Sequence, residues 1–298
     1  MNKCDETWDY LERFDMIDLT ETWMNEGMWE KIRTKVSSNF VWNCIPARKV
    51  HKKGRTKGGV ITAMRRNLRK ATVKVINDAA VEWKLVYNGN KWRIITVYSQ
   101  KIEETLETLM ERIMEENEEY LLIGGDFNAR TGNGGGPIRE EEKEEKSEIR
   151  KSIDKTVNKE GRTLLNKIGE RGWIILNGSF GNEGGWTYIG EAGSSVIDYV
   201  IGNDKAVEEV KRVKEGNRME SDHIPLEVEL IGPQINRRRE KKEMVEMERS
   251  IWTEEGVKNY QEKCERWSCT RDKTENIWKE IKEKVKGSIT KFKKRITP

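Results

Sequence analysis

Two polar residues at the end of an apolar run are the strongest chemical signal in this sequence. Residues 120–124 are predicted to form a buried strand, and Asp126 and Asn128 follow it directly. Side chains two positions apart in an extended chain point to the same face. A carboxylate and an amide that project together are able to hold a water molecule and a phosphate oxygen at once. The pattern therefore predicts a chemical site at the end of this strand.

The sequence contains two histidines, so any imidazole chemistry depends on His51 or His223. His51 lies among lysines and arginines, which would lower its pKa, and we expect it to be a solvated loop residue. His223 follows Asp222 just before the last predicted strand of the sheet region. Asp198, on the preceding part of that region, could accept the imidazole N–H of His223 and fix its tautomer. Asp222 would then be free to face a metal ion or a water.

Glu21 and Tyr98 each follow or end a predicted strand. A carboxylate in the position of Glu21 suits a hard divalent ion, since Mg²⁺ favours one or two carboxylates together with water and phosphate oxygens. The phenol of Tyr98 could reach a phosphate. Each residue taken alone is also typical of an ordinary turn acid or strand edge. Their significance comes from their occurrence together with the other polar residues named above.

Many strands in mixed order with a few helices predict an α/β fold, a two-sheet β-sandwich flanked by helices. Strands are predicted from β-branched and aromatic content, and helices from apolar residues at helical spacing. The predicted strands are 16–19, 60–64, 72–76, 81–87, 92–98, 120–124, 173–176, 185–189, 196–201, 206–213 and 224–230. The predicted helices are 3–14, 106–113 and 159–171.

Two regions differ in character from this core. Residues 132–151 are rich in glycine and then densely charged, which predicts an exposed insertion or loop. From residue 232 onward the chain is highly charged and has few prolines or glycines, which predicts a helical tail anchored by Trp252, Tyr260, Trp267 and Trp278. We therefore expect a first domain over residues 1–231 and a basic helical tail over 232–298.

Charge is unevenly distributed along the chain. Residues 232–298 hold 19 Lys and Arg against 12 Asp and Glu, whereas residues 1–231 hold 37 against 40. A basic tail favours polyanions such as nucleic acid, although a solvated helical surface would have the same composition.

The cysteines and the apolar segments bear on the compartment. The four cysteines form no disulfide framework, and the Cys264 and Cys269 pair lacks the further ligands of a zinc site. This favours a nuclear or cytoplasmic location. No apolar run approaches the roughly 18 residues of a membrane span, and the first 20 residues are too acidic for a signal peptide.

Taken together, the motifs resemble those of the endonuclease/exonuclease/phosphatase superfamily, and most of all the endonuclease domains of non-LTR retrotransposons. The resemblance covers about residues 5–231 and also extends to the basic linker that follows such domains. In chain order, the motifs are Leu19–Trp23, Gly58–Val60, Val97–Tyr98, Gly125–Ala129, Asn177–Gly178, Trp186–Tyr188, Ser195–Tyr199 and Ser221–His223.

The resemblance implies a role for each matching position. Glu21 would bind the catalytic Mg²⁺ or Mn²⁺, and Asp222 would be a further carboxylate near the metal. Asp126 would orient or deprotonate the attacking water, and Asn128 would hold the phosphate. The remaining roles would be a dyad that stabilises the transition state (Asp198, His223), a tyrosine near the scissile phosphate (Tyr98) and polar groups around the substrate (Thr187, Ser221).

The implied activity is Mg²⁺-dependent hydrolysis of one DNA strand, giving a nick with a 3′-OH, by a chain of retroelement origin. No membrane and no obligate protein partner is expected. One motif is unmatched, because members of the superfamily open with a strand that carries an Asn, and this sequence opens with a predicted helix. We therefore expect a gap in one sheet and one oxygen donor fewer.

Two other functions remain open at this point. One is a phosphatase of the same fold that acts on small phosphate esters, which the balance of 37 basic against 40 acidic residues in 1–231 slightly favours. The other is an inactive remnant or binding module that uses the basic tail, which the unmatched first strand favours.

Overall fold

A computed structural model describes residues 3–49, 56–68, 71–113, 119–137, 150–180, 183–191, 193–219, 221–232, 245–250, 254–267, 274–288 and 291–296. The chain divides into two compact units. The first unit comprises residues 1–137, 148–169 and 173–235, and the second comprises 138–147, 170–172 and 236–298. His51 and Trp252 lie outside the described residues.

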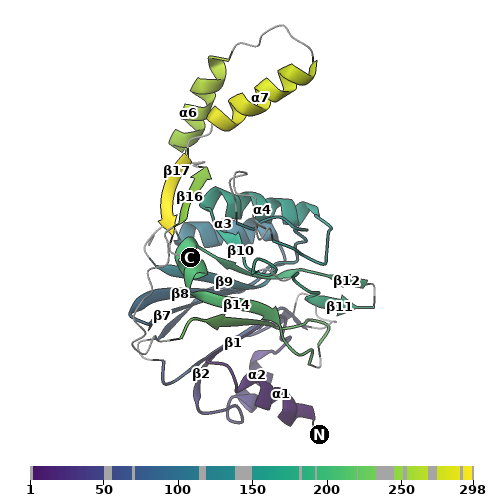
Figure 1. The fold of residues 1–298 in the computed structure, drawn as a ribbon. Helices are drawn as coiled ribbons and strands as arrows, with labels where there is room; N and C mark the ends of the chain where they lie inside the picture. Colours follow the sequence, from purple (N-terminus) through teal and green to yellow (C-terminus); the bar gives the residue numbers. More distant parts are fainter. Residues whose placement is uncertain are drawn as a thin grey trace. The chain divides into compact units, whose positions relative to one another are not determined.

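The larger sheet of the first unit has six strands in the order β10-β13-β9-β8-β7-β6. Figure 1 labels β7, β8, β9 and β10 of this sheet. Its strands are β6 (Thr72–Asn77), β7 (Ala80–Tyr87), β8 (Asn90–Tyr98), β9 (Tyr120–Asp126), β10 (Ile174–Ile175) and β13 (Asp198–Gly202). β8 and β9 are parallel, and every other neighbouring pair is antiparallel. A parallel pair needs a crossover connection, which helix α3 (Ile102–Ile113) supplies.

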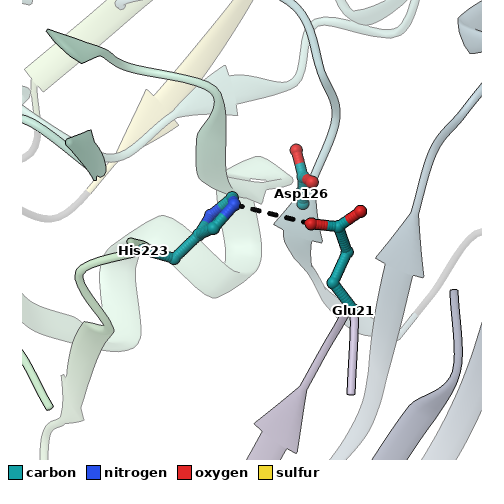
Figure 2. A group of neighbouring side chains, drawn as sticks. All are labelled: Glu21, Asp126 and His223. Carbon is teal, nitrogen blue, oxygen red and sulfur yellow. Dashed lines mark ion pairs between the residues drawn. The ribbon is translucent and has the colours of Figure 1, made fainter. Parts of the chain in front are cut away.

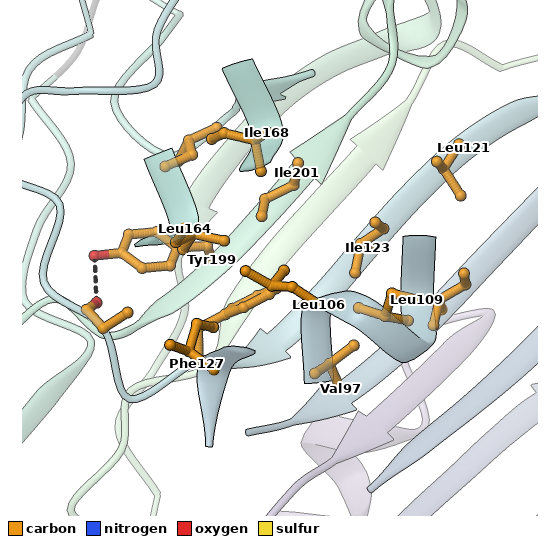
Figure 3. Close-up of a cluster of buried hydrophobic side chains, with 14 of the residues drawn as sticks. Val97, Leu106, Leu109, Leu121, Ile123, Phe127, Leu164, Ile168, Tyr199 and Ile201 are labelled. Carbon is orange, nitrogen blue, oxygen red and sulfur yellow. Dashed lines mark hydrogen bonds between the residues drawn. The ribbon is translucent and has the colours of Figure 1, made fainter. Parts of the chain in front are cut away.

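One face of this sheet is covered by two amphipathic helices, α3 and α4 (Lys159–Arg171). Alternate residues of β8, β9 and β13 point to this face, because side chains alternate along a strand. They pack with the apolar stripes of the helices in one buried cluster (Figure 3), which includes Val97, Leu106, Ile123, Leu164 and Tyr199.

The intervening residues of the same strands form the other core. Trp92, Leu122 and Val200 point away from the helices and pack with the second sheet. That sheet has the order β1-β5-β2, with β1 (Met16–Leu19), β2 (Phe40–Ile45) and β5 (Val60–Arg65). Its far side packs with residues at the end of helix α1 (Lys3–Leu11). Helix α2 (Glu26–Ile32) follows β1 and buries none of its residues.

Three two-stranded pairs complete the first unit. They are β3 (Arg48–Lys49) with β4 (Thr56–Lys57), β11 (Tyr188–Gly190) with β12 (Gly193–Ser195), and β14 (Val210–Glu215) with β15 (Leu226–Leu230). The prediction of two sheets packed as a sandwich with flanking helices is therefore confirmed. Within the described residues no helix is long and apolar enough for a transmembrane span.

Several elements of the first unit were not predicted, among them β2 and α2, and two further segments differ from the sequence prediction. The strand predicted over 206–213 begins instead as helix α5 (Asp204–Glu209), because the side chain of Asn203 caps it by accepting the Ala206 N–H at 3.0 Å. The predicted loop 132–151 is packed at both of its described ends. Arg150 is 1% exposed and donates to the carbonyls of Gly132 and Asn177. The buried guanidinium group thus links the end of the loop to its beginning. Residues 138–149 lie outside the described part.

The second unit combines helices with a strand pair. Helices α6 (Glu254–Glu265) and α7 (Thr274–Ser288) agree with the predicted helical tail. The antiparallel pair β16 (Val245–Ser250) and β17 (Lys291–Ile296) was not predicted, because the charged sequence masks its alternation. Trp267 acts as an anchor as expected, since its indole N–H donates to the hydroxyl of the buried Ser288 at 3.2 Å.

The expected gap lies at the edge of the smaller sheet. Within the described residues β1 pairs with β5 alone, and β15 pairs with β14 alone. A cavity of about 990 Å³ is lined by residues of both strands and by inward-facing residues of the six-stranded sheet, including Trp92, Ile94 and Leu122.

A buried ion pair in the six-stranded sheet generates a prediction about stability. Glu82 and Arg93 are 1% and 2% exposed and lie 2.5 Å apart, and Arg112 approaches the second oxygen of Glu82 at 3.3 Å. Glu82→Gln leaves two guanidinium groups without their carboxylate. We expect a loss of about 3 kcal/mol in the free energy of unfolding, measured by urea denaturation.

The control is Asp78→Asn, because the Arg48–Asp78 pair has the same chemistry but is 75% and 60% exposed. An exposed pair contributes about 0–1 kcal/mol, so this variant should unfold close to the wild type. Equal effects of the two substitutions would contradict the assignment of the buried pair to core stability.

Candidate functional site

Strand register aligns three ionisable side chains at one end of the larger sheet. Tyr98 at the end of β8 is the register partner of Asp126 at the end of β9. Asp126 is in turn the partner of Asp198 at the start of β13. The three side chains therefore lie side by side across adjacent strands. Gly125 permits this closeness, since a Cβ there would lie 1.9 Å from the carbonyl oxygen of Val97.

Glu21 reaches this end from the smaller sheet, on the turn that follows β1. The turn is held in an unfavourable conformation, with φ of 50° at Glu21 and 51° at Trp23. Backbone hydrogen bonds from Thr22 to Gly59 (3.2 Å) and from Trp23 to Gly58 (2.9 Å) hold it in place. A Cβ on Gly59 would meet the hydroxyl of Thr22 at 2.7 Å, which explains the Gly58–Gly59 motif in the sequence.

His223 is placed by backbone pairing with the segment around β11. Ile224 N–H donates to Thr187 O at 2.7 Å, and Ile189 N–H donates to Asp222 O at 2.8 Å. The imidazole also meets the ring of Tyr188 edge to face, with centroids 5.2 Å apart. These contacts fix the direction in which the imidazole points.

Glu21, Asp126 and His223 converge from these three elements (Figure 2). Each offers one potential ligand atom, and those atoms all lie within 4.8 Å of one another. The two carboxylates at one point suit a hard divalent cation, so the site fits the metal that the sequence resemblance implies, with His223 beside it. Glu21 Oε2 and His223 Nε2 are 3.8 Å apart.

The hydroxyl of Tyr98 donates to the Glu21 carboxylate. Burial and this carboxylate raise the pKa of Tyr98 far above its usual range, so the phenol stays neutral. In this structure Tyr98 therefore orients Glu21, and a phosphate would be its second contact.

Asp126 and Asn128 form a closed pair. The carboxylate of Asp126 accepts the backbone N–H of Asn128 at 2.8 Å and its side-chain amide at 3.0 Å. The same amide nitrogen donates to Ser99 O at 3.0 Å, so its two hydrogens are both engaged. Asn128 thus positions Asp126 here, and its expected hold on a phosphate would require one of these bonds to open.

The pKa of Asp126 is raised to about 7. Burial is the main cause, and repulsion by Asp198 adds to it, while the Asn128 N–H and the charge of His223 oppose it. The carboxyl therefore exchanges its proton near neutral pH, which suits a group that handles the proton of a water.

His223 and Asp198 form the expected dyad. The Nδ1 atom of His223 lies 3.0 and 3.1 Å from the two carboxylate oxygens of Asp198. Burial lowers the pKa of His223, but the hydrogen bond and charge of Asp198, aided by Asp126 and Asp222, outweigh it and raise the pKa to about 9. The imidazole is therefore cationic at neutral pH, donates from Nδ1 to Asp198 and turns Nε2 toward Glu21.

Three predicted residues lie less centrally than expected. Thr187 is fully buried, and its hydroxyl accepts the N–H groups of Ile197 and Asp198 at 3.0 and 3.1 Å. It therefore holds the backbone that carries Asp198 of the dyad. Ser221 accepts the N–H of His223 at 3.0 Å and is exposed. Asp222 is also exposed and is not part of the three-residue metal group, although its charge raises the pKa of His223.

Sequence reasoning gave no role to two residues that hold the site together. Asn177, 2% exposed, donates to Asp198 O and accepts the N–H of Val200, both at 2.9 Å, and so fixes the start of β13. The Asp154 carboxylate accepts from Arg130 at 2.7 Å and from the Val196 N–H at 3.1 Å, which ties the loop after Asn128 to the segment before Asp198. The Asn177–Gly178 motif could have indicated Asn177 from the sequence, whereas no pattern around Asp154 indicates its role.

Comparison with known proteins agrees with this geometry. Residues 92–227 match the protein family described as Endonuclease-reverse transcriptase. No curated protein matches the chain in sequence. The matched segment holds Tyr98, Asp126, Asp198 and His223, whereas Glu21 precedes it.

Three solved structures, two of them of NExo, share this fold. The endonuclease domain of TRAS1, a telomere-specific non-LTR retrotransposon, is 15% identical with a TM-score of 0.53, covering 76% of this chain and 90% of that one. The 3′ phosphatase NExo from Neisseria, bound to a product DNA hairpin, is 15% identical with a TM-score of 0.51, covering 76% and 94%. The 3′-5′ exonuclease NExo from Neisseria meningitidis is 16% identical with a TM-score of 0.50, covering 77% and 95%.

The family matched over residues 92–227 points to chemistry of the nuclease type, and the solved structures show that the fold is shared. The sequence resemblance is also confirmed, since family match and fold lead to the same group. The match over residues 92–227 and the shared fold therefore both resemble the endonuclease/exonuclease/phosphatase superfamily.

Proposed function

We propose that this chain hydrolyses a phosphodiester bond in DNA, nicking one strand with the help of a divalent cation. Mg²⁺ is the proposed ion, and Mn²⁺ is the alternative with the same ligand preference. The observation that carries the proposal is the convergence of Glu21, Asp126 and His223 within 4.8 Å from three separate elements.

Glu21 and Asp126 are the residues that would hold the cation, since they bring two carboxylates to one point. A bound divalent ion would neutralise the phosphate charge and the developing charge on the leaving oxygen. The bond from Tyr98 keeps the Glu21 carboxylate turned toward this point. Asp222 stays outside the group and would act on the site through its charge alone.

Asp126 is the proposed acceptor for the proton of the attacking water. Its pKa of about 7 and its two bonds from Asn128 suit this role, because the carboxylate is oriented and close to balance between its two forms. The His223 cation would donate from Nε2 to a phosphate oxygen as negative charge grows there. Asp198 keeps the proton on Nδ1 and so leaves Nε2 as the group that faces the substrate.

DNA is the proposed substrate on two grounds. The similar structures include a retrotransposon endonuclease domain and an enzyme bound to a DNA hairpin. The tail from residue 232 carries 19 basic against 12 acidic residues and would attract a polyanion. Small phosphate esters are the second candidate substrate. Residues 1–231 carry 37 basic against 40 acidic residues, so they lack the excess of positive charge that is typical of a DNA-binding domain.

The first test is nicking of supercoiled plasmid with Mg²⁺, with Mn²⁺ and with EDTA. We expect nicked circles with either metal and none with EDTA. Glu21→Gln and His223→Ala should each lower the nicking rate by about 10²–10⁴, the usual worth of one positioned acid, base or charge-stabilising group. Glu26→Gln is the matched control, since Glu26 is an exposed acid five positions from Glu21.

Equal background nicking by the wild type and by His223→Ala would overturn the catalytic assignment. Release of inorganic phosphate from small esters without nicking would favour the second candidate substrate. Absence of both activities in a folded protein would favour an inactive remnant that acts as a binding module.

The second test follows from the pKa of Asp126. This group is raised above its usual range to about 7, so below pH 7 it is protonated and must lose its proton to bind a cation. The affinity for the metal should therefore decrease as the pH is lowered, by about tenfold from pH 8 to pH 6. Titration calorimetry with Mn²⁺ at both pH values measures the ratio, and Asp126→Asn should bring it close to one. A wild-type affinity equal at both pH values would remove Asp126 from the ligand set.

A further inference from the structure

The basic residues of the first unit are unevenly spread, and a dense run of them lies beside the candidate site. Residues 48–57 contain six Lys and Arg and no Asp or Glu, although residues 1–231 as a whole hold 37 basic against 40 acidic residues. The described part of this run is the strand pair β3–β4, here named the basic hairpin, whose residues are Arg48, Lys49, Thr56 and Lys57. Residues 50–55, which connect the two strands, lie outside the described part of the chain.

The base of the basic hairpin is bonded to the turn that follows β1. The hydroxyl of Thr56 on β4 donates to the carbonyl of Trp23 at 2.8 Å. On the other side, the N–H of Ala47, just before β3, donates to the carbonyl of Met24 at 2.7 Å. Both strands of the hairpin are therefore fixed to the turn that also carries the proposed metal ligand of the smaller sheet.

The hairpin also reaches the side chains of the site. Gly58 directly follows Lys57, and a Cβ on Gly58 would lie 3.4 Å from Cε1 of the Tyr98 ring. The hydroxyl of this ring donates to Glu21. Consecutive Cα atoms are about 3.8 Å apart, so the backbone of Lys57 lies one residue away from the ring that orients the Glu21 carboxylate.

The cations of the hairpin are held together with little compensation. Arg48 and Lys57 are cross-strand partners, and like charges in such positions destabilise a strand pair. Arg48 lies 2.6 Å from Asp78, but these two side chains are 75% and 60% exposed. Lys49 and Lys57 are exposed, and neither has an ion-pair partner among the described residues. The fold thus keeps three cations at the rim of the site against their mutual repulsion, which suits a surface that meets an anion.

The spacing of these cations suits a chain of phosphates better than a single one. Paired strands lie about 4.8 Å apart, and residues rise about 3.3 Å along a strand, so the three side chains start from neighbouring backbone positions. One strand of DNA carries a phosphate every 3.4 Å or so along the helix axis, about the same repeat. A small ester at the metal group would leave the hairpin to solvent, whereas a nucleic-acid strand brings further phosphates to it.

We propose that the basic hairpin binds the phosphate backbone of DNA on one side of the bond that the candidate site cleaves. Lys49 and Lys57 contact phosphates directly, and Arg48 exchanges Asp78 for a phosphate, which costs little because that pair is exposed. Contacts of this kind position the strand and add affinity without reading its sequence. The inference rests on the proposed function, since it assigns to the same site a nucleic-acid strand rather than a small phosphate ester.

The test is the salt dependence of DNA binding by the full chain. A fluorescein-labelled duplex of about 20 base pairs is titrated in EDTA, which prevents cleavage, and binding is followed by fluorescence anisotropy between about 50 and 200 mM salt. Each phosphate contact contributes about 0.9 to the slope of log K against log salt concentration. Lys57→Gln should lower the slope by about 0.9, and the double variant Lys49→Gln with Lys57→Gln by about 1.8. Over this range the wild type should lose about twelvefold more affinity than the double variant.

The matched control is Lys91→Gln, which removes the same charge. Lys91 is exposed, has no ion-pair partner among the described residues, and lies near the start of β8, seven positions before Tyr98. At about 3.3 Å per residue it is roughly 23 Å from the site end of that strand. This variant should keep the slope of the wild type. The basic tail is present in every variant, so differences in slope report on the substituted lysines.

Three results would overturn the proposal: no binding of the duplex by the wild type at the lowest salt, a slope of the double variant equal to that of the wild type, or an equal loss of slope in Lys91→Gln. If the double variant loses binding to phosphatidylserine vesicles but keeps its DNA slope, the hairpin belongs to a membrane surface instead.

Plasmid nicking with Mg²⁺ separates this inference from the proposed function. The double variant should raise KM for the plasmid and leave kcat unchanged, because its residues bind the strand away from the reacting atoms. A wild type that fails to nick but shows the expected change in slope contradicts the proposed function alone. Active nicking with an unchanged slope contradicts the role of the hairpin alone.

Discussion

The structure depends on one constraint, the burial of two aspartates side by side at the end of a sheet. The register of β8, β9 and β13 leaves no freedom here, because Tyr98, Asp126 and Asp198 are partners across adjacent strands. Two like charges in a buried place repel each other, and each is also deprived of water. Positive charge must therefore be supplied, and His223 supplies it at 3.0 Å from Asp198.

The same constraint explains why the site suits a cation. His223 compensates for Asp198, but Asp126 and Glu21 still face each other with one shared imidazole between them. The raised pKa of Asp126 is the sign of this surplus of negative charge. A divalent ion would relieve it, and the neutral donors around it, Tyr98 and Asn128, already hold the two carboxylates in position.

Rigidity at the site comes from groups that no substrate would touch. Asn177 and Asp154 bind the backbone on either side of Asp198, and Gly59 allows the strained turn at Glu21. Such strain persists only where surrounding contacts over-determine the conformation, which is common at functional sites. Within the described residues β1, which leads into the Glu21 turn, pairs with β5 alone, so this turn depends on its bonds to Gly58 and Gly59.

The sequence by itself determined the sandwich fold, most of the strands, and the residues Glu21, Tyr98, Asp126, Asn128, Asp198 and His223 as candidates. It could do so because alternation and motif order are local properties of the chain. β2, α5 and the β16–β17 pair were not predicted from the sequence. A single cap decides α5, and β16 and β17 are partners over forty positions apart. The role of Thr187 as a buried acceptor of backbone N–H groups was also not predicted, because the residue type alone does not indicate how exposed a side chain is. Tertiary structure alone decided which carboxylates meet and which amide hydrogens are already engaged. These facts depend on distances between segments remote in the chain, and packing sets those distances.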